Sequence, residues 1–193
     1  MALLTRAVPR RFRGLRCRVG AWGLALGLCA AAAAHADAGL EYAVKAAYLY
    51  KFAPFVGWPA NAFPTPASPF TICLFGDDPF GPALDQALRG QVVVGHRVVV
   101  RRLAAIGEDP GCQVLYLGRS AHPSATEALR ALRGLPILTV TDEAQGSSGG
   151  VVQFVLREGR VRFALDADQA RANGLELSSK LMALAVSVKR SGG

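Results

Sequence analysis

Runs of apolar residues alternate with amphipathic segments along most of this chain. Nearly continuous apolar or β-branched runs predict strands at residues 70–75, 92–94, 97–103, 113–117 and 136–141. Amphipathic segments predict helices at residues 39–53, 79–89 and 124–132. Strands that alternate with short helices build a mostly parallel sheet with helices on both faces. The predicted fold class is therefore α/β.

The pattern changes towards the carboxyl terminus. Two alternating runs, residues 151–156 and 160–165, flank Arg157-Glu158-Gly159 and predict an antiparallel hairpin added to the edge of the sheet. Leucines at helical spacing then predict a last helix at residues 168–188. Gly174 lies inside this segment and weakens the first half of the predicted helix.

The first predicted helix carries two apolar stripes on nearly opposite sides. One stripe comprises Val44, Tyr48, Phe52 and Phe55, and the other comprises Tyr42, Ala46, Leu49 and Ala53. A helix with two apolar faces needs protein on both. One face can pack on the sheet of this domain, whereas the other needs a loop, a second copy or a different partner.

Aromatic side chains concentrate in the same region. Seven of the thirteen aromatic residues that follow residue 36 lie between Tyr42 and Phe63. Aromatic residues bury large areas at low entropic cost, so they suit interfaces, although they also fill cores. From this segment we predict Tyr42, Leu49 and Tyr50 as exposed contacts with a partner.

The amino-terminal segment, residues 1–36, has the three parts of a cleavable export signal. Arginines without acids come first, an apolar run follows at residues 19–34, and small residues end the segment in Ala34-His35-Ala36. The apolar run has 16 residues, short of the roughly 20 that span a bilayer as a helix. We therefore predict one periplasmic domain at residues 37–193, with no membrane insertion after processing.

Two other export routes fit less well. Arg10-Arg11 would suit a twin-arginine signal, but Arg13-Gly14 stands where an apolar pair is usual. A lipid anchor on Cys29 is disfavoured by the large Leu28 before it.

Removal of the signal changes the charge of the protein. The whole chain carries a formal net charge of +8, but six of its 22 basic residues lie in the signal, which leaves 16 against 14 acidic residues, a net charge of +2. A nearly neutral surface with dispersed arginines is not typical of a nucleic-acid-binding protein. We predict no nucleic-acid partner.

Two cysteines remain after processing, Cys73 and Cys112. Disulfides persist in the periplasm, so we predict a bridge between these residues. Two buried thiols that act as small hydrophobic side chains are the alternative.

Motifs that would indicate a cofactor or a metal are incomplete. Gly76 and Gly81 have the separation of a phosphate-binding loop, but Pro82-Ala83 follows where a lysine and a hydroxyl are needed. His96 and His122 lie on separate predicted turns without metal-ligand spacing. We predict no cofactor and no metal.

Catalytic patterns are equally weak. The chain has no G-x-S-x-G turn, and Lys180 lies one residue too close to Ser178 for the S-x-x-K spacing. We therefore predict no catalytic residues and no enzymatic activity. Asp77 and Asp78 follow the first long strand, where α/β sheets place ligands, but a turn and a helix cap explain both.

Several segments together resemble the YfiR-like family of periplasmic regulators. The likeness extends from about Glu41 to Arg190 and is carried, in order, by residues 44–52, 57–59, 70–80 and 173–185. The last of these contains a serine pair before a leucine-rich stretch, which is similar to the last helix of that family.

The resemblance implies a small Rossmann-like domain without catalytic activity, often a homodimer. The best-understood member of the family represses an inner-membrane diguanylate cyclase by holding its periplasmic sensing domain in the inactive state. Cys73 and Cys112 lie where the family can carry a cysteine pair. A second pair, which some relatives have in the region of residues 140–154, is missing here.

The resulting hypothesis is a periplasmic regulator that binds such a cyclase, or a similar sensor protein, and represses cyclic di-GMP signalling. One alternative is a small-molecule sensor or carrier that uses the carboxyl ends of the strands near Asp77, Asp78 and Arg119. Another is an unrecognised secreted hydrolase.

Overall fold

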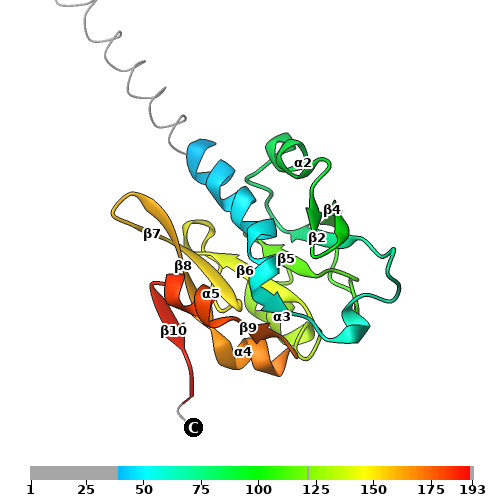
Figure 1. Ribbon diagram of the computed structural model, residues 1–193. Helices are drawn as coiled ribbons and strands as arrows, with labels where there is room; N and C mark the ends of the chain where they lie inside the picture. Colours follow the sequence, from blue (N-terminus) through cyan, green and yellow to red (C-terminus); the bar gives the residue numbers. More distant parts are fainter. Residues whose placement is uncertain (1–38, 121, 192–193) are drawn as a thin grey trace, which may run out of the picture. The chain divides into compact units, whose positions relative to one another are not determined.

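Three parallel strands of wholly buried residues form the centre of the structure, a computed structural model that describes residues 39–120 and 122–191 (Figure 1). These strands are β2 (Phe70–Phe75), β5 (Val114–Leu117) and β6 (Leu138–Asp142). Their almost continuous apolar sequences suit burial on both faces of a sheet. The predicted export signal, residues 1–36, lies outside the described residues.

Five further strands complete an eight-stranded sheet in the order β10-β8-β7-β6-β5-β2-β4-β3. They are β3 (Val92–Val93), β4 (His96–Leu103), β7 (Val152–Arg157), β8 (Arg160–Asp166) and β10 (Ser187–Lys189). The β3–β4 and β7–β8 pairs are antiparallel, and the other neighbouring pairs are parallel. The predicted α/β class with a mostly parallel sheet is confirmed.

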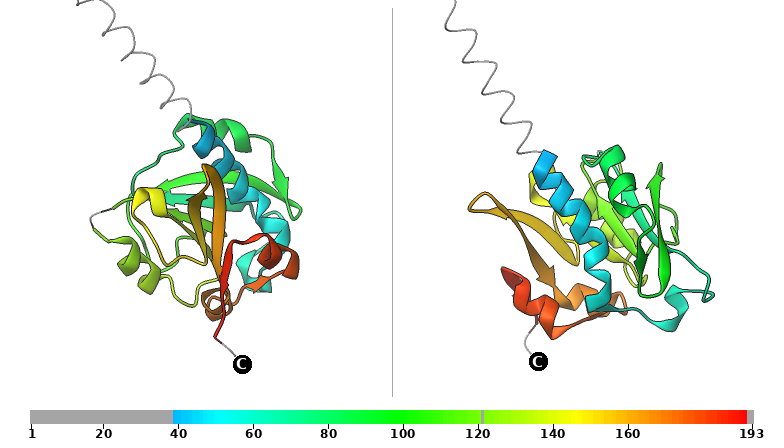
Figure 2. Two further views of the ribbon diagram at one scale, coloured as in Figure 1. Left: turned by 90° about the vertical axis from the view of Figure 1, so that its left-hand side faces the viewer. Right: turned by 45° about the horizontal axis from the view of Figure 1, so that its top comes forward.

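Successive side chains of β2 enter two different hydrophobic clusters, as the two-residue period of a strand requires. Phe70, Ile72 and Leu74 belong to a cluster that also contains residues of the first helix and of α2 (Pro82–Leu88). Cys73 and Phe75 belong to a second cluster, which contains Ala128 of α3 (Ala125–Ala131). The first helix is described over residues 39–51 and is called helix 39–51 below; Figure 2 shows it lying across the curled sheet.

Local sequence explains where α3 and α2 begin. The Ser124 hydroxyl accepts the Glu127 N–H at the start of α3, and the Glu127 carboxylate accepts the Ser124 N–H, which forms a capping box. At α2 the predicted start, Pro79, is wrong. Asp78 accepts the N–H groups of Phe80 and Gly81 and so holds a turn, and the helix begins at Pro82.

The predicted last helix, residues 168–188, is also wrong. The segment forms α4 (Ala167–Ala172), β9 (Glu176–Leu177), α5 (Ser179–Leu184) and β10. Gly174 has a φ of 69° and ends α4, because a residue in the left-handed region cannot continue a helix. β9 then pairs with β1 (Val56–Gly57), and β10 pairs with β8. The predicted β7–β8 hairpin is present, but β10 lies outside it, so it is not at the edge.

Short 3₁₀ turns complete the described chain: η1 (Ala53–Phe55), η2 (Ala60–Ala62) and η3 (Glu143–Gln145). The turn between β3 and β4 places Val94 at a φ of 52° and Gly95 at a φ of 83°. Glycine suits such a turn, whereas a β-branched residue is strained there. The side chain of Val94 is also 56% exposed.

The predicted disulfide between Cys73 and Cys112 is present, with 5.9 Å between the two Cα atoms. Cys73 lies within β2 and Cys112 lies two residues before β5. Both cysteines are buried in the second cluster. The bridge therefore joins β2 to the segment that leads into its neighbour β5.

Loss of this disulfide should destabilise the domain. Its two cysteines are 39 residues apart, and closing a loop of that length in the unfolded chain corresponds to about 4 kcal/mol. We expect a reducing agent, or the substitutions Cys73→Ala and Cys112→Ala together, to lower the free energy of unfolding by an amount of this order. Urea titration measures it. Equal stability of the oxidised and reduced protein would contradict this expectation.

Candidate functional site

Helix 39–51 presents one apolar side to solvent. We call this side the outer helix face; along it lie the exposed or partly exposed residues Leu40, Ala43, Val44, Ala47 and Lys51. Leu40 is 67% exposed and Val44 is 38% exposed. Ala43, Val44, Ala47 and Lys51, together with Tyr48, line a groove of about 380 Å³.

The outer helix face is not the set of contacts that the sequence predicted. Leu49 has no exposed surface, so its prediction as an exposed contact is wrong. Tyr42 is half-buried, with its ring edge-on to Phe80 at 5.6 Å. Tyr50 is also half-buried and packs against the first cluster. All three residues therefore pack at least partly against this domain itself.

Packing within the domain covers most of both predicted stripes, and in the first stripe this packing is aromatic. The Tyr48 and Phe52 rings stack at 5.4 Å, and both lie within about 6 Å of Phe154 on β7 and Phe163 on β8. The outer helix face therefore includes only one residue of the two predicted stripes. Val44 is the most exposed of the four residues in the first stripe.

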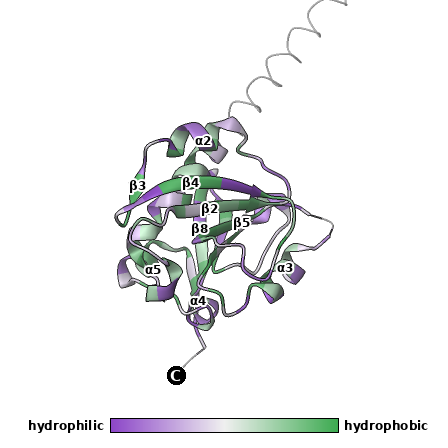
Figure 3. Ribbon diagram, turned by 90° about the vertical axis from the view of Figure 1, so that its right-hand side faces the viewer, coloured by the Kyte–Doolittle hydropathy of each residue, from purple (hydrophilic) through white to green (hydrophobic). Residues whose placement is uncertain are grey.

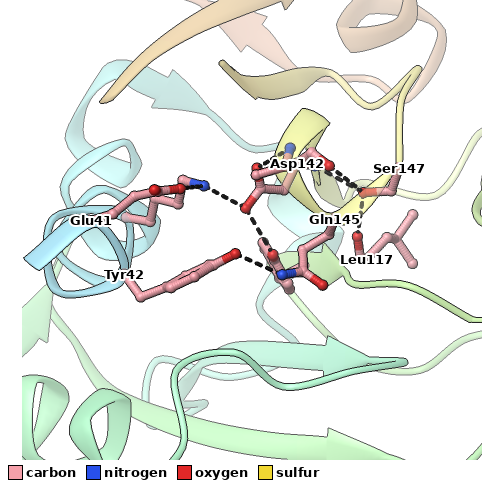
Figure 4. A network of polar contacts seen from close by, with 9 residues as sticks. Glu41, Tyr42, Leu117, Asp142, Gln145 and Ser147 are labelled. Atoms are coloured by element: carbon pink, nitrogen blue, oxygen red, sulfur yellow. Dashed lines mark hydrogen bonds and ion pairs between the residues drawn. The ribbon is translucent and has the colours of Figure 1, made fainter. Parts of the chain in front are cut away.

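A buried lysine fixes this helix to the sheet (Figure 4). Lys45 has no exposed surface, and its ammonium group donates to the Asp142 carboxylate at 2.7 Å and to Glu41 one helical turn earlier. Asp142 also accepts the Tyr116 hydroxyl proton at 3.1 Å. The lysine Nζ lies 4.7 Å from the centre of the Tyr42 ring, which adds a cation–π contact.

The sequence at the end of β6 holds Asp142 in place. Asp142 is the last residue of β6, and its second carboxylate oxygen accepts the N–H of Ala144 at the start of η3. Its own N–H donates to the Ser147 hydroxyl, which donates in turn to the carbonyl of Leu117 at the end of β5. Gln145 of η3 reaches back to the Tyr42 hydroxyl at 2.6 Å. The network thus joins helix 39–51, β5, β6 and η3.

Two pKa values in this network are shifted upwards. Burial by itself lowers the pKa of Lys45, but the hydrogen bonds to Asp142 and Glu41 outweigh burial, so this pKa lies above its ordinary value. Burial and the neighbouring Asp142 charge raise the pKa of Tyr116 far above its usual range. In the folded protein Lys45 is therefore protonated and Tyr116 is neutral.

Sequence reasoning missed this network. A lysine between Tyr42 and Leu49 on the inner side of an apolar helix is the signal that could have indicated a buried partner. Its partner Asp142 is 97 residues away in the sequence and could not be paired with it from the pattern alone.

At the carboxyl ends of β2 and β5, where the carrier hypothesis places a ligand, the two loops that follow the strands touch each other. The N–H of Asp77 donates to the carbonyl of Arg119 at 2.8 Å. A Cβ atom added to Gly118 would lie 2.1 Å from the carbonyl oxygen of Asp77, so the two loops touch through their backbones. Asp78 holds its turn and pairs with Arg102 at 2.8 Å. These residues are occupied with one another.

Over residues 39–120 and 122–191, no group of three or more histidine, cysteine or acidic side chains is arranged to hold a metal. His96 stacks on Phe63 at 4.1 Å, with its Nδ1 atom 2.6 Å from the carbonyl of Ser68, and His122 is exposed. Within the same residues, no helix is both long enough and apolar enough to cross a bilayer.

A comparison with protein-family models matches residues 42–186 to the YfiR/HmsC-like family. The chain belongs to the YfiR/HmsC-like family. The match covers the buried network except Glu41, both bridged cysteines, and the outer helix face except Leu40. The resemblance seen in the sequence is thereby confirmed for this YfiR/HmsC-like protein.

Removing one charge of the buried pair should strongly destabilise the domain. Lys45→Met leaves the Asp142 carboxylate buried without its cation, which costs about 3–5 kcal/mol of unfolding free energy in comparable pairs. Lys51→Met on the exposed side of the same helix is the control, with an expected change within about 0.5 kcal/mol. Urea titration distinguishes the two. Similar stabilities for both variants would show that the pair does not hold the helix.

The same pair predicts a loss of stability in alkali. Because the pKa of Lys45 is raised, its contribution is complete below the ordinary lysine value of about 10.4 and disappears as the pH rises through the folded-state pKa. Tyr116, whose pKa is also raised, acts in the same direction. We expect unfolding free energy to fall above about pH 10, more steeply in the wild type than in Lys45→Met. Identical alkaline slopes would contradict the assignment.

Proposed function

We propose that the processed protein is a periplasmic, non-enzymatic regulator. In this proposal it binds the periplasmic domain of an inner-membrane diguanylate cyclase and represses cyclic di-GMP signalling. Membership of the YfiR/HmsC-like family is the observation that carries this proposal. The pattern of an export signal at residues 1–36 supports the periplasmic location.

The outer helix face supports a binding role. Covering exposed leucine and valine side chains with a partner removes apolar surface from water, which favours binding. The groove along this face is bounded by alanines, so a partner side chain can approach the helix closely. The buried Lys45 network holds the helix in one orientation, which lowers the entropy lost on binding.

Repression would operate as a population shift. A cyclase that exchanges between active and inactive conformations is repressed by a partner that binds the inactive one more tightly. A shift from mostly active to mostly inactive, from 99:1 to 1:99, needs about 10⁴-fold preference for the inactive state. The regulator therefore needs no chemistry of its own. If the protein is a homodimer, as the family resemblance implies, each copy presents its own outer helix face.

Deletion of the gene should raise intracellular cyclic di-GMP, measured by mass spectrometry of cell extracts. Complementation with Ala43→Glu, which places a charge in the groove, should fail to restore the low level. Ala87→Glu changes an exposed alanine on α2 in the same way and should restore it. The periplasmic amounts of both variants are compared by immunoblot. An unchanged cyclic di-GMP level after deletion, under several growth conditions, would refute the proposed function.

A further inference from the structure

One long strand of the sheet has an open edge. β2 pairs with residues 98–103 of β4 on one side, whereas β3 covers only Arg97 and His96 on the other. Figure 3 shows β4 as the outermost long strand, with the short β3 beside its beginning. Within the described residues, no strand pairs with the outer side of β4 after Val98.

The backbone of this edge is ready to accept another strand. The Val98 N–H points outwards and donates to the carbonyl of Gln91. Because backbone groups alternate along a strand, the N–H and C=O groups of Val100 and Arg102 also point outwards. An extended peptide can satisfy such a row of groups by adding itself to the sheet.

One face of β4 alternates arginine with apolar residues. Arg97 and Arg101 are exposed, and Val99 and Leu103 between and beyond them are partly exposed. Arg101 donates to the carbonyl of Pro110, but neither arginine pairs with a carboxylate in the described residues. Arg102, on the opposite face, differs because Asp78 and Asp85 neutralise it.

A cavity adjoins this arginine face. It has a volume of about 380 Å³, and its lining includes Val99, Arg101, Thr71 and Gln113. Asp109 also lines the cavity, and its carboxylate accepts the N–H of Gly111 rather than pairing with Arg101. A side chain from an added strand that faces Arg101 would therefore meet both a cation and open space.

We propose that the open edge of β4 binds an extended, acidic segment of a partner protein, which pairs as a ninth strand of the sheet. One of its carboxylates faces Arg101, Arg97 adds positive charge where β3 ends, and its alternate residues face Val100. Arginine suits this role because its guanidinium binds a carboxylate through two parallel hydrogen bonds. This inference goes beyond the proposed function, because it specifies a second surface and holds whichever protein supplies the segment.

Charge decides against a second copy of this chain as the occupant. Two β4 edges paired with each other would bring arginines on the same face close together across the strands. Like charges at neighbouring cross-strand positions are destabilising. Edge arginines therefore exclude self-pairing while they admit an acidic strand.

The test uses the processed protein, labelled with ¹⁵N, and capped hexapeptides that alternate valine with glutamate. We expect the amide signals of Val100 and Arg102 to shift on titration. A peptide with lysine in place of glutamate should bind at least tenfold more weakly. Two further glutamate peptides carry N-methyl groups, one on its valines and one on its glutamates. In an added strand, the N–H groups of either the valines or the glutamates point towards β4 and bond to it. We therefore expect one of the two methylated peptides to lose binding and the other to keep it.

Protein variants complete the test. Arg97→Glu/Arg101→Glu should reverse the preference, so that the lysine peptide binds better. Arg130→Glu/Arg133→Glu makes the same charge change on exposed residues at α3 and should leave the preference unchanged. No shift at Val100 and Arg102, or full binding by both N-methylated peptides, would overturn the proposal. A protein dimer that the glutamate peptide separates would also overturn it, by identifying a second copy as the occupant.

Discussion

The ion pair between Lys45 and Asp142 determines how helix 39–51 lies on the sheet. A lysine without exposed surface is stable only if its charge is matched, and Asp142, Glu41 and the Tyr42 ring match it together. Because Asp142 is itself held by η3 and Ser147, the helix has little freedom to slide or rotate. The apolar surface that it presents to solvent is therefore set by a polar contact on its opposite side.

Much of the sheet could be predicted because its central strands are unusually uniform. Residues 70–75 contain no charged side chain, and such a run predicts a strand buried on both faces. The carboxyl-terminal segment could not be predicted in this way. Leu177, Leu181 and Leu184 have helical spacing, but Gly174 ends α4 and pairing with β1 and β8 converts the flanking residues to strands. Tertiary pairing overrides periodicity there.

The binding surfaces were harder to predict than the strands, because a sequence does not reveal which apolar residues the fold itself will cover. The aromatic cluster between Tyr42 and Phe63 suggested exposed contacts, yet Phe154 and Phe163 from distant strands cover Tyr48 and Phe52. What remains exposed is small: Val44, Leu40 and a few alanines. The open edge of β4 is equally hidden in the sequence, since it depends on the shortness of β3.

The disulfide encloses one margin of the sheet. Cys73 and Cys112 bracket α2, β3 and β4, so the β4–β3 margin of the sheet lies in one covalent loop anchored in the core. If this margin opens, its two ends stay fastened to adjacent strands, and reclosure needs no long-range search. A tether of this kind lets an exposed edge return to its place in the sheet without help from another protein.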